Sequence, residues 1–289
     1  MGFVFGIASA LCFAVGSILF KVGQRSRPDD DGHLIGNTLS VATFAVFAIF
    51  VSWPTYDRAG FWVLVVAGIV GTVVGRWSLL RGVRLIGPAR AAPFHTATPI
   101  SAAVFGWILL GEDIRPLEAV GAAFTILGLL RIVRGGTSAA GDEPIPKASY
   151  LIAAVAPASF GLAFVLRKWG LERMPGAVSG ALIGSAAGVL LLVVWESAHH
   201  RLVPRLRTIP ADPPWHYFTA GVVTGIALLT QFRALALVDA WVVGILGGTI
   251  AIWTPFLSVA FLKDEDRITP ALLVNIGLVF AGVVTIALV

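Results

Sequence analysis

The chain has 289 residues, of which 57% are hydrophobic and 13% are charged, and its formal net charge is +5. With a mean hydropathy of +0.88, it has too little polar surface for a water-soluble protein of this length. The excess of Lys and Arg does not indicate a nucleic-acid partner, because these residues gather near the ends of apolar segments. We therefore expect the lipid bilayer, and no nucleic acid, among its partners.

Apolar segments long enough to cross a membrane follow one another along the whole chain. A helix needs about 20 residues to cross roughly 30 Å of hydrocarbon. The segments are apolar on all sides rather than alternating, which favours helices over the strands of a barrel. The first carries no signal-peptide features, so we expect it to be retained. Ten such segments are predicted: 3–22, 33–52, 61–83, 88–110, 116–134, 149–169, 176–196, 214–237, 240–262 and 269–289.

Prolines mark both the starts and the interiors of these predicted helices. A proline in the first turn costs no backbone hydrogen bond, and this position fits Pro88, Pro116, Pro214 and Pro270. An interior proline removes a backbone hydrogen bond and kinks its helix. Interior positions are expected for Pro93, Pro99, Pro157 and Pro255. Such kinks serve either packing or gating, and the sequence leaves both interpretations open.

The two halves of the chain repeat one another. FAVGSILFKVG at 13–23 matches FGLAFVLRKWG at 160–170, which places Lys21 on Lys168 at a shift of 147. The ordered matches continue with Pro116 on Pro270 at a shift of 154. Each half holds five segments, an odd number, so the halves enter the membrane in opposite directions. The predicted fold is therefore an all-α polytopic membrane protein of ten transmembrane helices in two inverted five-helix repeats, at 1–134 and 149–289, joined by a linker at 135–148.

The ends of the two halves carry the most specific motifs. WILLGEDIRPLEAVGAAFTILGLL at 107–130 and LKDEDRITPALLVNIGLVFAGVVTI at 262–286 resemble the repeat ends of EamA-type members of the drug/metabolite transporter superfamily. The resemblance implies a carrier that moves small metabolites by alternating access, with helices three, four, eight and nine lining a central cavity. Asp266 and Asn275 depart from the family pattern, which usually has Glu and Gly there. Glu112 and Asp113 are interpreted as hinge and capping residues.

Polar side chains deep in the apolar segments are the candidates for substrate binding, because such groups are costly in lipid. Each has an ordinary structural alternative: the bilayer interface for the arginine, a core position for the histidine, a backbone hydrogen bond for the threonine and lipid contact for the tryptophans. The predicted substrate-binding residues are Arg76, Trp77, His95, Thr98, Gln231 and Trp253.

No acidic residue lies in the middle of a predicted span. A cation in such a cavity would meet only the positive charges of Arg76 and, when protonated, His95. We therefore expect a substrate with an anionic or zwitterionic group, and His95 is the candidate for any proton coupling. No metal site is expected, since Cys12 is the single cysteine and adjacent histidines at 199 and 200 point apart on a helix. No cofactor motif occurs, and no nucleotide-binding loop is present.

Three functions are compared with these features of the sequence. A small-molecule transporter in the cell membrane accounts for the duplication, the prolines and the polar positions. A flippase for a lipid-linked intermediate would need a basic groove open to the bilayer. A membrane-embedded enzyme would need paired carboxylates or a metal cluster, and the sequence has neither, so no enzymatic activity is expected. A homodimer is left open.

The orientation in the membrane has two conflicting indications. The loops between helices 1–2, 3–4, 5–6, 7–8 and 9–10 hold most of the Lys and Arg residues. The opposite side is assigned Arg58, Arg115, Arg167, Lys168, Arg173 and Arg233. The positive-inside rule then favours both termini outside, whereas the family resemblance implies both inside.

Overall fold

A computed structural model describes residues 1–26, 33–86, 97–135, 146–200, 202–203, 215–262 and 270–288. Within these ranges the chain is helical and contains no strand, and each of the ten predicted spans contains at least part of a described helix. The all-α prediction is therefore confirmed. The helices are α1 (Gly2–Ser26), α2 (His33–Ala48), α3 (Arg58–Gly68), the π-helix η1 (Ile69–Gly75), α4 (Arg76–Ile86), α6 (Thr98–Leu110), α7 (Pro116–Gly135), α8 (Lys147–Arg173), α9 (Ala177–Ala198), α11 (Trp215–Leu235), α12 (Ala240–Gly248), α13 (Ile250–Leu262) and α14 (Pro270–Ala287).

Two of the predicted helix starts are confirmed, because Pro116 and Pro270 are the first residues of α7 and α14. Pro157 lies inside α8, as predicted. The prediction of an interior kink at Pro99 is wrong, since α6 begins at Thr98 and the proline occupies its first turn. There its missing N–H costs nothing. The prolines at 88, 93 and 214 lie outside the described residues.

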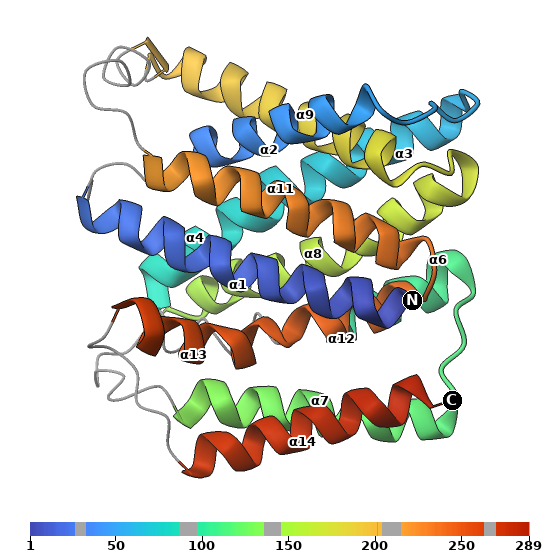
Figure 1. Cartoon of the computed structure of the whole chain (residues 1–289), viewed down its shortest axis with the longest axis vertical. Coiled ribbons are helices and arrows are strands. Elements are labelled where there is room, and N and C mark those ends of the chain that lie inside the picture. Colours follow the sequence, from blue (N-terminus) through green and yellow to red (C-terminus); the bar gives the residue numbers. More distant parts are fainter. Residues whose placement is uncertain are drawn as a thin grey trace.

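The helices pack mainly across the two halves rather than within each half. α1 packs along α11, and its counterpart α8 packs along α3, η1 and α4. α6 lies against α8, and α13 lies against α1. The pairs α2–α9, α6–α12 and α7–α14 join equivalent helices (Figure 1). Exchanging the halves therefore maps the contacts onto one another, which is the arrangement of two inverted repeats.

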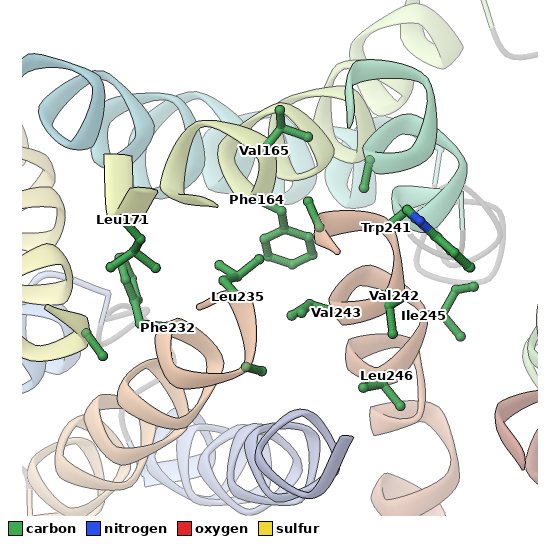
Figure 2. Packing of buried hydrophobic residues seen from close by; sticks show 14 of the residues in the cluster. Phe164, Val165, Leu171, Phe232, Leu235, Trp241, Val242, Val243, Ile245 and Leu246 are labelled. Atoms are coloured by element: carbon green, nitrogen blue, oxygen red, sulfur yellow. The ribbon is translucent and has the colours of Figure 1, made fainter. Parts of the chain in front are cut away.

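The apolar side chains divide between a buried core and an outer surface. Phe164 from α8, Phe232 from α11 and Trp241 from α12 belong to the cluster where these three helices meet (Figure 2). On the outer surface many large apolar side chains are exposed, including Phe50 at 80% and Phe261 at 69%. Such a surface is stable only against lipid. The chain is an integral, multi-pass membrane protein.

Two spans depart from a continuous α-helix. The third changes to a π-helix over Ile69–Gly75, and the ninth is interrupted at Thr249 between α12 and α13. π-helical turns are rare and occur mostly at functional sites. Interrupted spans are typical of the helices that form transporter binding sites. Both irregularities therefore make the region between the repeats a candidate binding site.

Candidate functional site

A buried arginine lies between the two repeats. Arg167 sits on α8, six residues before the end of that helix at Arg173. At 1.5 Å per residue, six residues place it about 9 Å from the helix end. The whole residue is only 9% exposed. Its Nη1 donates a hydrogen bond of 2.8 Å to Oε1 of Gln231 on α11.

Aromatic rings and a glycine shape the pocket around this guanidinium. Its Cζ lies 5.4 Å from the centre of the Phe232 ring and 5.9 Å from that of Phe164. The first repeat contributes Gly71 of η1, where an added Cβ would lie 3.1 Å from Nη2 of Arg167. A side chain at position 71 would therefore crowd the guanidinium. The glycine in the π-helix keeps this space for the arginine.

The charge of Arg167 has no carboxylate partner among the described residues, where its one hydrogen bond goes to the neutral amide of Gln231. A guanidinium has five N–H donors, and this one uses a single donor toward the described residues. Burying an ion without a counter-charge costs several kcal/mol. Two cation–π contacts offset about 1 kcal/mol each, and a charged hydrogen bond offsets about 1.5–3 kcal/mol. The centre is therefore chemically suited to a ligand that carries an anionic group.

The next residue along α8 takes part in a second charged cluster. Lys168 Nζ lies 2.9 Å from Oε1 of Glu112 and also pairs with Asp239. Glu112 follows α6 in the first repeat, and its Oε1 accepts a hydrogen bond of 2.9 Å from the backbone N–H of Ala240. The interpretation of Glu112 as a capping residue is thus supported, but the helix it caps is α12 of the other repeat. This cluster ties the two repeats together at one end of the bundle.

The predicted site residues occupy several different places. Gln231 is buried and contacts Arg167. Thr98 is buried at the start of α6. Arg76 begins α4, half-buried, with its Cζ 5.8 Å from the centre of the Phe20 ring.

The predicted aromatic and ionisable residues are placed less centrally. Trp77 is 57% exposed on the outer surface, where the bilayer lies. Trp253 on α13 is partly buried, and its indole Nε1 has no hydrogen-bond partner among the described residues. His95 lies outside the described residues. Of the predicted residues that the structure describes, Gln231 alone is hydrogen-bonded to Arg167.

Arg167 is missing from the predicted site residues. It lies inside the predicted span at 149–169, but the charge count grouped it, with Lys168, among the loop residues of one side. That grouping is wrong, because α8 is 27 residues long and ends only at Arg173. The signal in the sequence was Pro175 followed by Gly176, which indicates a helix end beyond the basic pair. Reading the turn from those two residues would have placed the arginine nearly two turns inside the helix.

The described residues contain no group of three His, Cys, Asp or Glu side chains that could hold a metal ion. In comparisons with known proteins, the model of the EamA-like transporter family matches residues 1–134 and 147–288. Among solved structures 29 chains match. One, titled only as a crystal structure of a protein, aligns over 99% of this chain and 96% of its own with a TM-score of 0.75 and 18% identity, a likeness of fold alone. None of the curated proteins matches.

Proposed function

This chain belongs to the EamA-like transporter family, and from that premise we propose that it carries a small anionic or zwitterionic metabolite across the cell membrane by alternating access. It is a membrane transporter of the drug/metabolite transporter superfamily. The proposed substrate contact is Arg167, with Gln231 beside it, rather than the arginine at position 76. The proposal assigns the protein no enzymatic reaction.

The observation that carries the proposal is the buried guanidinium of Arg167, which has no carboxylate partner in the described part of the chain. A ligand carboxylate or phosphate would complete the unused N–H donors and supply the missing counter-charge. It would bind best where water is excluded, because electrostatic attraction is stronger in a medium of low dielectric constant. An organic cation would instead add a second positive charge to an already costly one.

The architecture supports alternating access. The Lys168–Glu112–Asp239 cluster holds α6, α8 and α12 together at one end of the bundle. The π-helix η1 and the interruption at Thr249 provide points where spans three and nine can change direction. Release of the cluster and closure of the other end would move the Arg167 centre from one side to the other. A flippase is less well supported, because Arg167 is enclosed rather than open to lipid.

The test is a thermal-shift screen of purified protein, since a ligand that binds only the folded state raises the melting temperature. The panel contains small carboxylates, phosphate esters, zwitterions and organic cations. We expect stabilisation by anionic or zwitterionic compounds, lost in Arg167→Gln and retained in Arg173→Gln, a matched arginine that is exposed on the same helix. Compounds that stabilise are then tested for counterflow uptake into proteoliposomes. Stabilisation by organic cations alone, or retention in Arg167→Gln, overturns the proposal.

A further inference from the structure

A cavity of about 390 Å³ lies at the end of the bundle where α8 turns into α9 and α11 turns into α12. Its lining includes Lys168, Glu172, Arg233 and Asp239, two basic and two acidic side chains. The chain begins at the same end, since a Cβ added at Gly2 would contact Val238. The cavity is separate from the Arg167 centre, because Arg167 does not line it.

The two carboxylates that hold Lys168 differ in their surroundings. The Glu112 side chain is 4% exposed and also caps α12, so it is anchored on two sides. The Asp239 side chain is 44% exposed and makes no capping hydrogen bond to α12. Among the described residues, its carboxylate pairs with Lys168 alone. An ion pair with an exposed carboxylate is weaker than a buried one, because water competes for that carboxylate. Asp239 is therefore the replaceable partner and Glu112 the permanent one.

We propose that this cavity is a second binding site, in which an anionic group of a small molecule replaces Asp239 on Lys168. With Asp239 turned into solvent, the cavity presents Lys168 and Arg233 to the anion, and Glu172 faces any ammonium group of a zwitterion. The inference rests on the proposed function for the charge of the ligand. The cavity is then an outer binding stage of transport, because Lys168, which lines it, directly follows Arg167 on α8. The two residues then receive the same anionic group in turn, first at the cavity and then at the centre.

The experiment uses thiol labelling of a cysteine placed in the cavity. In a Cys12→Ser background, which has no other cysteine, Ala236→Cys puts a thiol on the lining, and Ser52→Cys is the exposed control. Rates are compared for an anionic (sulfonate-bearing) and a cationic (trimethylammonium-bearing) methanethiosulfonate. We expect the anionic-to-cationic ratio to be at least about threefold higher in the cavity than at the control. This is less than the tenfold or more of a cleft lined by one sign of charge, because Glu172 and Asp239 share the lining with Lys168 and Arg233. Replacing chloride with succinate at constant ionic strength should slow labelling of the cavity thiol.

Three substitutions separate the possible outcomes. Lys168→Gln and Arg233→Gln should each lower the rate ratio toward that of the control, and Arg233 is exposed, so its variant keeps the test valid if Lys168→Gln does not fold. Arg167→Gln should leave the ratio unchanged. A cavity ratio equal to the control, or one that neither outer substitution alters, overturns the second site. The ligand-induced shift in melting temperature is measured separately in Arg167→Gln. A failure of the proposed contact at Arg167 is therefore distinguishable from a failure of the second site in the cavity.

Discussion

Replacing the buried arginine together with its amide partner should make the ligand-free protein more stable. In Arg167→Met/Gln231→Leu the uncompensated charge is gone and no polar atom is left without a partner. Methionine also suits the position, because its sulfur packs well between the Phe164 and Phe232 rings that now flank the guanidinium. Apolar replacement of buried charged groups commonly stabilises proteins by about 1–4 kcal/mol. We expect a gain at the lower end, about 1–2 kcal/mol, because two cation–π contacts of about 1 kcal/mol each are lost.

The single substitutions should behave differently from the pair. Arg167→Met removes the charge but leaves Oε1 of Gln231 unsatisfied, which costs about 1–3 kcal/mol and cancels most of the gain. Gln231→Leu leaves the guanidinium without a hydrogen-bond acceptor among the described residues and should be the least stable of the set. The four proteins form a double-mutant cycle that measures the coupling between the two side chains.

The assay is thermal unfolding of the purified proteins in detergent, with and without an anionic compound that stabilises the parent. The double variant should melt at a higher temperature than the ligand-free parent and show no ligand-induced shift. If the double variant instead melts several degrees below the parent, Arg167 is satisfied by the fold itself. In that case the charge of Arg167 does not need a ligand as its counter-charge.

Three further predictions concern packing, the charged cluster and orientation. Gly68→Ala would place a Cβ 1.8 Å from a backbone carbonyl oxygen of α9 and should cost about 1–3 kcal/mol or more in thermal unfolding, whereas Gly247→Ala, with no atom within 4 Å, should have little effect. Glu112→Gln should destabilise by about 3 kcal/mol, because it breaks a buried ion pair, and Asp239→Asn by less than about 1 kcal/mol, because the Asp239 carboxylate is exposed to water and Lys168 keeps Glu112. A topology reporter fused after Val289 should report an outside location, and an inside location would show that the family resemblance outweighs the charge count.

The elements that sequence reasoning predicted best are those fixed by local chemistry. A proline at the start of α7 and of α14 needs no tertiary contact to favour a helix start, so Pro116 and Pro270 were predictable. The five-plus-five repeat was equally visible, because an odd number of spans in each half forces an inverted arrangement. The π-helix η1 was not predictable, since its turn depends on how closely α8 packs against Gly71 and Gly75.

The site was harder to predict, because the depth of a residue in the bundle and the rotation of its helix decide which groups its side chain contacts. Arg76 was chosen for its depth along span three, but depth does not fix which way a side chain points, and the adjacent Trp77 points outward. Arg167 was counted with the loop charges of one side, although the predicted span at 149–169 contains it. Helix length and the Pro175–Gly176 turn are better markers, since a helix ends where its backbone must turn.

Two consecutive basic residues on α8 connect the buried centre with the end of the bundle. Residues one position apart on a helix point about 100° apart, so Arg167 faces Gln231 in the interior while Lys168 faces Glu112 and Asp239 at the cavity. Within the described ranges Arg167 has no carboxylate partner, whereas Lys168 has two, the anchored Glu112 and the exposed Asp239. An anion that enters through the cavity therefore first competes with Asp239, the more weakly held carboxylate, and then reaches the uncompensated charge of Arg167. If α8 tilts during transport, both charges move together, because they belong to one turn of one rigid helix.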